Sequence, residues 1–179
     1  MDVNDVAQGS STRLSKTRIR LIAASAAVVG LFLDQVTKSL AVAHLTPGEP
    51  RHLIGSLLQL RITRNPGAAF STGTGITVLI SCIAIVAAFV VAWIVVVKTR
   101  DWLWALALGL LQAGILGNVV DRLVREPSPL KGHVVDFLEL PHWPIFNVAD
   151  CFITVAAVLI VIQAGRGIRL DGTREVASR

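Results

Sequence analysis

The chain has 179 residues, of which 53% are hydrophobic and 16% are charged, and its mean hydropathy is +0.65. This composition excludes an ordinary water-soluble domain, which would be much less apolar at this length. The net charge of +5 is compatible with nucleic-acid binding, but the basic residues flank hydrophobic runs instead of covering one soluble face. We therefore expect a membrane protein with no nucleic-acid partner.

The cysteines and histidines show no pattern typical of a disulfide framework or a metal site. Cys82 and Cys151 lie within hydrophobic runs and have no CxxC spacing. The histidines are scattered outside these runs without an H-x-x-x-H spacing. We expect no metal ion, and nothing in the sequence requires a nucleotide or redox cofactor.

The first hydrophobic run, residues 19–43, follows a small polar segment, residues 1–15, which is predicted to be a disordered cytoplasmic tail. A helix needs about 20 apolar residues to cross the ~30 Å hydrocarbon core, and this run continues without a signal-peptide cleavage site. It is predicted to be a retained membrane helix. Asp34 and Lys38 are four residues apart and can pair on one face of it. The sequence does not decide whether this pair is a structural ion pair or part of a functional site.

A long polar connection, residues 44–75, separates the first run from the second. Apolar and polar residues alternate from Leu58 to Thr63, which is typical of a half-buried strand. Turn signals at residues 47–50 and 65–67 flank this strand. The connection is therefore predicted to form a small β-rich cap on one membrane face.

Two further spans are predicted at residues 76–97 and 102–120. The first carries no charged residue, and the second begins with Trp102 and Trp104, whose rings favour the membrane interface. Glycines in the second span, Gly114 and Gly117 among them, permit close approach of neighbouring helices.

The last span is predicted at residues 144–165, with Pro144 in its first turn. The preceding loop is rich in proline, and its centre, residues 134–138, is either a short strand or an interfacial segment. Residues 167–179 form a basic cytoplasmic tail. The predicted fold is an all-α integral membrane protein with one domain, residues 16–166, of four transmembrane helices and a small extracytoplasmic β-rich cap.

The distribution of basic residues predicts the orientation. They are concentrated in the two terminal flanks and in the connection at residues 98–100, and are sparse in the two long loops. The positive-inside rule then places both termini in the cytoplasm and both long loops outside. In this orientation the polar residues of three spans gather at the outer leaflet.

The gathered residues include two copies of one pattern, Asn118-x-x-Asp121 and Asn147-x-x-Asp150, with Asp136 between them. Positions i and i+3 share a helix face, so each Asn can bond to its Asp or to a common substrate. By this repeat alone, Asp121 would pair with Asp150.

A pair of carboxylates in a poorly hydrated site retains one proton, because both cannot ionise easily. Such a dyad can activate water and polarise a carbonyl, which is aspartic-type peptide hydrolysis. Serine or cysteine nucleophiles fit less well, because no partner base is positioned for them. The alternatives are an ion- or proton-coupled transporter, since intramembrane Asp, Lys and Asn also mark ion paths, and a purely structural membrane protein.

Five motifs in this order resemble lipoprotein signal peptidase, also called signal peptidase II. They are Asp34-Gln35-x-Thr37-Lys38, Arg64-Asn65-x-Gly67-Ala68-Ala69-Phe70, Gly117-Asn118-x-x-Asp121-Arg122, Val134-Val135-Asp136-Phe137 and Phe146-Asn147-x-Ala149-Asp150. Pro66 stands where the family often has threonine. The resemblance implies an aspartic endopeptidase of the bacterial inner membrane that removes signal peptides from diacylglyceryl-modified prolipoproteins, cutting before the modified cysteine.

The resemblance also implies the site. It makes Asp136 and Asp150 the catalytic pair and gives Asp121 a supporting role, in place of the pairing that the repeat suggests. It implies a substrate contact for residues 67–70, and membrane lipid and prolipoproteins as partners of a monomer. The residues that it places in binding or supporting roles are Asp34, Lys38, Asn65, Gly67, Gly114, Gly117, Asn118, Asp121, Arg122, Asn147 and Ala149.

Overall fold

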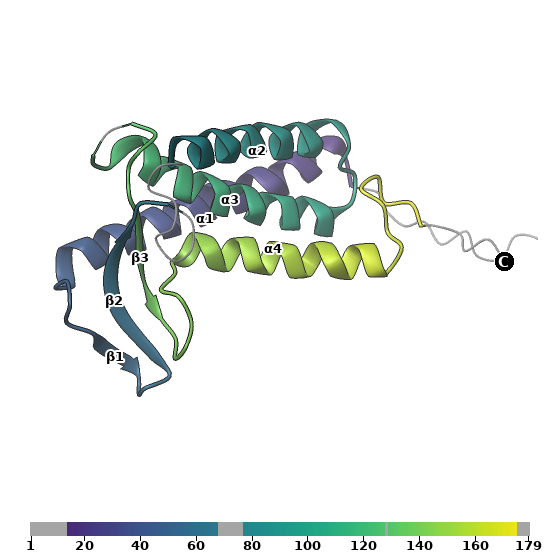
Figure 1. Cartoon of the computed structure of the whole chain (residues 1–179). Coiled ribbons are helices and arrows are strands. Elements are labelled where there is room, and N and C mark those ends of the chain that lie inside the picture. The colour runs from purple at the N-terminus through teal and green to yellow at the C-terminus, as the bar shows by residue number, and fades with distance from the viewer. Residues whose placement is uncertain (1–13, 68–76, 128, 175–179) are drawn as a thin grey trace, which may run out of the picture.

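The computed structural model describes residues 14–67, 77–127 and 129–174, and these residues form four helices and a three-stranded sheet (Figure 1). The helices are α1 (Lys16–His44), α2 (Thr77–Val97), α3 (Trp102–Val124) and α4 (Val148–Gly165). All four are long and apolar enough to cross a membrane. The prediction of a four-helix membrane protein is confirmed. The predicted tail at residues 1–15, apart from Leu14 and Ser15, lies outside the described residues, as do residues 68–76 and 175–179.

Two helix boundaries differ from the prediction. α3 continues to Val124, so Arg122 belongs to this helix and not to the following loop. α4 begins at Val148 and not near Pro144, because Asn147 adopts an extended conformation and caps the helix. An Asn at this position satisfies a backbone N–H that the first turn leaves without a partner.

α3 lies at the centre of the bundle and packs against each of the other three helices. Small buried residues along it, including Ala105, Gly109 and Ala113, allow this close packing. A Cβ added to Gly109 would lie 2.5 Å from the backbone oxygen of Ala23, so α1 and α3 nearly touch here. By contrast, the outer face of α2 is apolar and exposed, with Phe89 73% accessible, as expected for a surface in contact with lipid.

The sheet consists of β1 (Arg51–Ile54), β2 (Leu58–Asn65) and β3 (Val134–Glu139), antiparallel in the order β1-β2-β3. The predicted β-rich cap is thus confirmed, and residues 134–138 are a strand and not an interfacial segment. β2 and β3 are far apart in sequence, and their register places Thr63 opposite Asp136 and Asn65 opposite Val134. This pairing places the connection between α1 and α2 beside the connection between α3 and α4.

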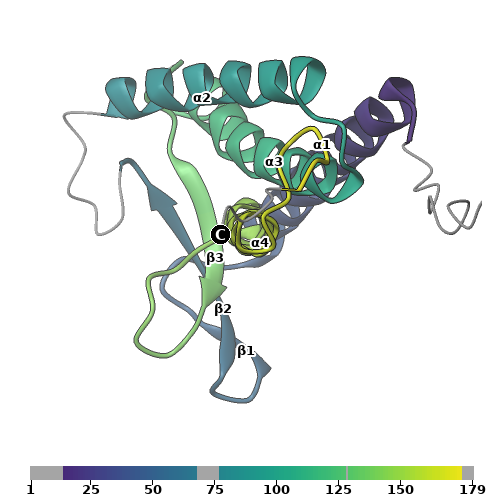
Figure 2. The ribbon, with the colours of Figure 1, turned by 90° about the vertical axis from the view of Figure 1, so that its right-hand side faces the viewer.

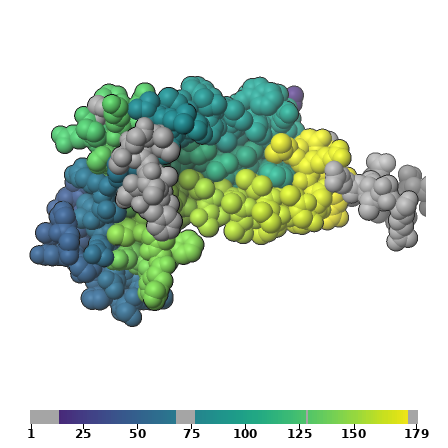
Figure 3. Space-filling view, viewed as in Figure 1, coloured from purple at the N-terminus to yellow at the C-terminus, as the bar shows by residue number. Residues whose placement is uncertain are grey.

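The sheet lies at one end of the bundle and projects sideways beyond α4 (Figures 2 and 3). The last turns of α1 pack beneath it, where Ala41 and Leu45 form a buried cluster with Val135 and Phe137. The start of α1 and the end of α4 lie at the opposite end of the bundle (Figure 1).

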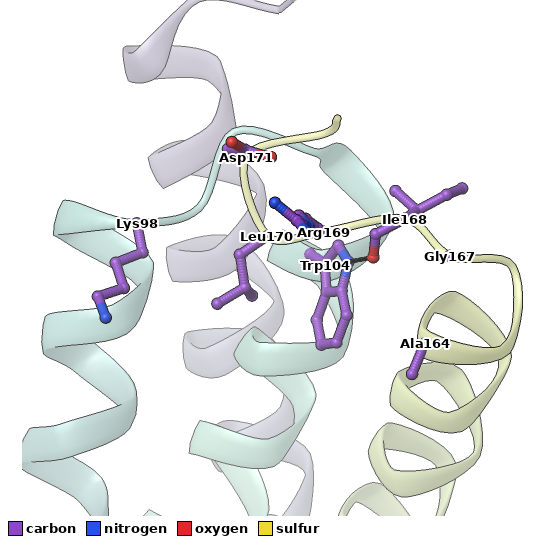
Figure 4. Close-up of a pocket in the computed structure, with 8 residues that line it drawn as sticks. All are labelled: Lys98, Trp104, Ala164, Gly167, Ile168, Arg169, Leu170 and Asp171. Atoms are coloured by element: carbon purple, nitrogen blue, oxygen red, sulfur yellow. Dashed lines mark hydrogen bonds between the residues drawn. The ribbon is translucent and has the colours of Figure 1, made fainter. Parts of the chain in front are cut away.

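A turn after α4 closes this opposite end. The Trp104 indole donates from Nε1 to the Ile168 oxygen over 2.9 Å, and the Arg100 backbone N–H donates to the Leu170 oxygen over 2.8 Å. Figure 4 shows Trp104 beneath the turn with Leu170 beside it. Residues 167–174, predicted as part of a basic tail, therefore pack onto the bundle.

Candidate active site

A cavity of about 610 Å³ lies between the sheet, the last turns of α3 and the first turn of α4. Polar and charged side chains from four separate elements line it. Those that the sequence analysis singled out are Asn65, Asn118, Arg122, Asp136, Asn147 and Asp150. Gly67 also lines the cavity, and its backbone N–H donates to Oδ1 of Asn65 over 3.1 Å.

Asp136 projects from β3 and is only 3% exposed. Its Oδ1 accepts a hydrogen bond from Asn147 Nδ2 at 2.6 Å, and its Oδ2 accepts one from Asn65 Nδ2 at 3.1 Å. Burial raises the pKa of Asp136 to about 6, and the nearby Asp150 adds to this rise, while the two hydrogen bonds oppose it. The carboxyl of Asp136 can therefore hold a proton much closer to neutral pH than an exposed aspartate can.

Asp150 lies in the first turn of α4 and forms a capping box with Asn147. The Asp150 backbone N–H donates to Asn147 Oδ1, and the Asn147 backbone N–H donates to Asp150 Oδ2, each over 3.1 Å. The Asn147-x-x-Asp150 pattern is therefore a helix start, and not the shared helix face that the i, i+3 spacing suggested. The cap fixes the Asp150 carboxylate at the N-terminus of α4, where the helix dipole favours negative charge.

Two asparagines join the two carboxyl groups. Asn147 Nδ2 donates to Asp136 and also to Asn118 Oδ1, the latter over 3.2 Å. Asn118 Nδ2 in turn donates to Asp150 Oδ1 over 3.0 Å. The amides thus connect Asp136 with Asp150 and fix the direction of both side chains. No such bond joins Asn118 to Asp121 among the described residues, although the repeat in the sequence suggested one.

Lys38 is completely buried beside this cavity. Its Nζ lies 2.9 Å from Asp34 Oδ2 and 2.9 Å from Asp121 Oδ2, and it donates to Asn118 Oδ1 over 3.0 Å. The ion pair expected between Asp34 and Lys38 is present. It forms part of a larger network that ends on one of the asparagines of the cavity.

Asp121 belongs to this ionic network and does not line the cavity. Its side chain is fully buried, and Arg125 Nε donates to its Oδ1 over 2.8 Å. Its Oδ2 also accepts from the Val135 backbone N–H over 3.1 Å, one residue before Asp136. Asp121 is thus placed to hold β3 against α3, and the pairing with Asp150 that the repeat suggested is not formed.

Close backbone packing holds α4 against α1 and α3. The Ala149 backbone N–H donates to Asp34 Oδ1 over 2.9 Å. A Cβ on Gly117 would lie 2.5 Å from Asp34 Oδ2, and one on Gly114 would lie 2.5 Å from the Ala149 oxygen. The two glycines and Ala149 therefore make room for the network and do not contact the cavity themselves.

Arg122 is the cation of the cavity. It is 8% exposed, and its Nη1 donates to the Asn118 backbone oxygen over 3.3 Å. Its Nε is buried without a hydrogen-bond partner among the described residues. Its guanidinium interacts electrostatically with both Asp136 and Asp150. Arg122 is therefore available to an oxygen atom of a bound substrate.

Sequence reasoning gave no role to three residues that complete the network. Gln35 donates from Nε2 to Asp34 Oδ2 and to the Gly117 oxygen, each over 3.0 Å. Arg125 follows Asp121 by four residues, and this i, i+4 spacing is a signal in the sequence for their ion pair. The third residue, Gly132, packs against the end of α3 so closely that an added Cβ would overlap the Asp121 backbone oxygen. No local pattern in the sequence reveals this contact.

A second cavity, of about 600 Å³, lies at the opposite end of the bundle beneath the turn after α4 (Figure 4). Its charged lining residues are Lys98, Arg169 and Asp171. Asp171 is fully exposed, and hydrogen bonds from Thr173 lower its pKa below the ordinary value. Asp171 is its one carboxyl group in the part of the chain that the structure describes, so the described lining does not offer the paired carboxyl groups of the first cavity.

Comparisons with known proteins identify the family of this chain. The family described as signal peptidase (SPase) II matches residues 26–166. The lipoprotein signal peptidase of Rhodococcus jostii (strain RHA1) is 47% identical over 156 residues, which cover 87% of this chain and 78% of that protein. The one of Mycobacterium leprae (strain Br4923) is 45% identical over 158 residues, or 88% of this chain and 78% of its own length.

A solved structure of a bacterial membrane enzyme superposes with a TM-score of 0.73 at 28% identity, covering 89% of this chain and 94% of that chain. The family match spans all five motifs, the whole of α2, α3 and α4, and α1 from residue 26 onward. The chain therefore belongs to the signal peptidase II family and is a multi-pass membrane protease.

Proposed function

We propose that this protein is an aspartic endopeptidase that cleaves the signal peptides of diacylglyceryl-modified prolipoproteins on the N-terminal side of the modified cysteine. Asp136 and Asp150 are its catalytic pair. The observation that carries this proposal is that both carboxyl groups line one cavity and that Asn147 is hydrogen-bonded to each of them.

The two carboxyl groups have different environments, and we therefore assign them different roles in the reaction. Asp136 is buried and its pKa is raised to about 6, so it takes up a proton more readily than an exposed aspartate, and we assign it the shared proton of the pair. Asp150 lies in the first turn of α4 and accepts two hydrogen bonds, from Asn118 and from the Asn147 backbone, which hold its carboxyl oxygens in place beside the cavity. The pair thus combines a general acid with a general base.

The reaction follows from this division. Asp150 removes a proton from a water molecule as its oxygen attacks the scissile carbonyl, and Asp136 gives its proton to the carbonyl oxygen. Asp150 then protonates the departing amine of the cysteine, while Asp136 regains a proton from the tetrahedral intermediate. The signal peptide leaves with a new carboxyl group, and no covalent enzyme intermediate forms. Arg122 is placed to bind a substrate carbonyl oxygen near the scissile bond.

The remaining residues position these groups. Asn65, Asn118 and Asn147 hold the carboxyl groups in place. The network of Asp34, Lys38 and Asp121 supports Asn118 and β3 from behind. The implied substrate contact at residues 68–70 falls outside the described residues, whereas Gly67 lines the cavity.

The cavity belongs at the outer leaflet of the cytoplasmic membrane, with both termini in the cytoplasm. The basic residues near the ends of the chain support this orientation. A diacylglyceryl anchor also keeps the cleavage site of a prolipoprotein near the membrane interface, which is where a cavity at the sheet end of the bundle would meet it. The transporter alternative gains no support, because the polar cluster is confined to this end and α2 carries no charged residue.

Cleavage of a purified diacylglyceryl-modified prolipoprotein tests the proposal. We expect the wild type to cut before the modified cysteine, and Asp136→Asn and Asp150→Asn to fold normally but not to cut. An active Asp136→Asn or Asp150→Asn variant would contradict the catalytic pair. Failure of the wild type on every diacylglyceryl-modified substrate would contradict the proposed activity.

A further inference from the structure

A second, smaller groove of about 390 Å³ lies on the other side of β3 from the catalytic cavity. Asp136 lines the catalytic cavity, and its neighbour Phe137 lines the groove, as expected because successive strand residues point to opposite faces. The other walls of the groove come from the last turns of α1, from β2 and from the first residue of β1. A ligand in this groove would therefore leave the catalytic cavity free.

The floor of the groove is apolar. Leu40 and Ala41 of α1, and Leu45 directly after it, face Leu60 and Phe137 of the sheet. Among the described residues, no carboxylate lines the groove. The polar group of Thr37 is already used, since its hydroxyl donates to the Leu33 and Asp34 backbone oxygens. This lining suits a hydrocarbon chain.

The groove is open towards the surrounding lipid. Leu33, Val36 and Leu40 follow one another at spacings of three and four residues, so they share one face of α1. They are 44%, 37% and 53% exposed, respectively. A chain that enters the groove between α1 and the sheet can therefore continue along this stripe into the hydrocarbon core.

The rim of the groove is cationic and lies at the depth of lipid headgroups. α1 has 29 residues and is roughly 43 Å long, which exceeds the ~30 Å hydrocarbon core, so its last residue, His44, reaches the headgroup region. His44 is held at the rim by a hydrogen bond from Nδ1 to the Leu40 oxygen over 3.0 Å. Arg51 stands beside it at the start of β1, exposed, and forms no ion pair within the described residues.

We propose that this groove binds one phospholipid of the surrounding bilayer, with an acyl chain on the apolar floor and its phosphate at Arg51. The guanidinium matches the phosphate, because its fork of N–H donors fits phosphate oxygens. A diacylglyceryl chain of a substrate has no phosphate and would leave Arg51 without a partner. The cationic rim therefore identifies a phospholipid, and not the lipid of the substrate, as the occupant.

Binding is tested by native mass spectrometry of the full, delipidated protein in detergent, titrated with phosphatidylglycerol. Diacylglycerol with the same acyl chains serves as the uncharged probe. We expect one phosphatidylglycerol to bind the wild type more tightly than diacylglycerol. Arg51→Gln should weaken phosphatidylglycerol binding about fivefold, which corresponds to the loss of one cationic contact at a membrane surface, and should leave diacylglycerol binding unchanged.

Arg61→Gln is the matched control. Arg61 lies on the neighbouring strand, pairs with Glu139 over 3.0 Å and does not line the groove, so this change should not affect lipid binding. Leu40→Trp fills the mouth of the groove and should weaken both probes, whereas Val29→Trp changes an exposed residue of α1 away from the groove and should weaken neither.

Two results would overturn the proposal. One is equal phosphatidylglycerol binding by the wild type and Arg51→Gln. The other is diacylglycerol binding as tight as that of phosphatidylglycerol, because it would assign the groove to a neutral chain such as the lipid of a substrate. Neither result depends on peptidase activity.

Discussion

Asn147 donates from Nδ2 to Oδ1 of Asp136 over 2.6 Å, so the residue that starts α4 also holds a carboxyl group of β3. The same amide accepts from the backbone N–H of Asp150 through Oδ1. The position of α4 and the geometry of the two aspartates are therefore set by one side chain.

Substitution of Asn147 separates these two functions. Asn147→Ala removes both the cap and the bond to Asp136, so we expect a loss of about 1 kcal/mol in the free energy of unfolding together with loss of cleavage. Asn147→Ser keeps a capping hydroxyl but cannot bridge to Asp136. We expect it to retain most of the stability and still to lose activity, as measured by thermal unfolding in detergent and by the cleavage rate. Equal stability losses in both variants would show that the cap is unimportant.

Lys38→Met tests the buried ionic network. The change leaves Asp34 and Asp121 without their shared cation, so we expect a loss of roughly 3–5 kcal/mol in the free energy of unfolding. Arg61→Gln breaks the more exposed pair with Glu139 and should cost about 1 kcal/mol or less. Denaturant unfolding of the purified variants measures both values. A small effect of Lys38→Met would contradict a large contribution of this network to stability.

Gly117→Ala tests the close contact between α1 and α3. The added methyl would lie 2.5 Å from Asp34 Oδ2 and 3.0 Å from the Ala149 Cβ, so the network must shift, and we expect a loss of stability of about 1–3 kcal/mol. Gly165→Ala is the matched control at the end of α4, where an added Cβ meets nothing within 4 Å. It should be neutral or slightly stabilising, because alanine favours helix more than glycine does. A shift in unfolding temperature of the same sign and size in both variants would contradict this explanation.

The raised pKa of Asp136 predicts how stability depends on pH. Its pKa is about 6 in the folded protein and near 3.8 when unfolded, so the folded state binds the proton more tightly. The stability from this group is fully present below about pH 4 and is lost as the pH rises through about 6. Asp136→Asn removes this titration. The difference in unfolding temperature between wild type and variant should therefore change between pH 4 and pH 6.5 in favour of the variant, and a constant difference would contradict the raised pKa.

Hydropathy alone was sufficient to predict the four spans, because a helix in lipid needs a long apolar run whatever its neighbours are. The pairing of Asp34 with Lys38 was equally accessible, since both lie on one helix and their spacing determines that they meet. The strand in residues 58–63 followed from its alternation of apolar and polar side chains.

Local pattern could not distinguish the two Asn-x-x-Asp repeats, which are identical in spacing and different in structure. Asn118 and Asp121 lie within α3 and bond to different partners, Asp150 and Lys38 respectively. Asn147 and Asp150 form the first turn of α4 and bond to each other. Periodicity describes one helix at a time, whereas these contacts join α1, α3, β3 and α4. Only the packing of those elements decided which aspartates share a cavity, because each carboxyl group takes the donors that its neighbouring elements bring within hydrogen-bond distance.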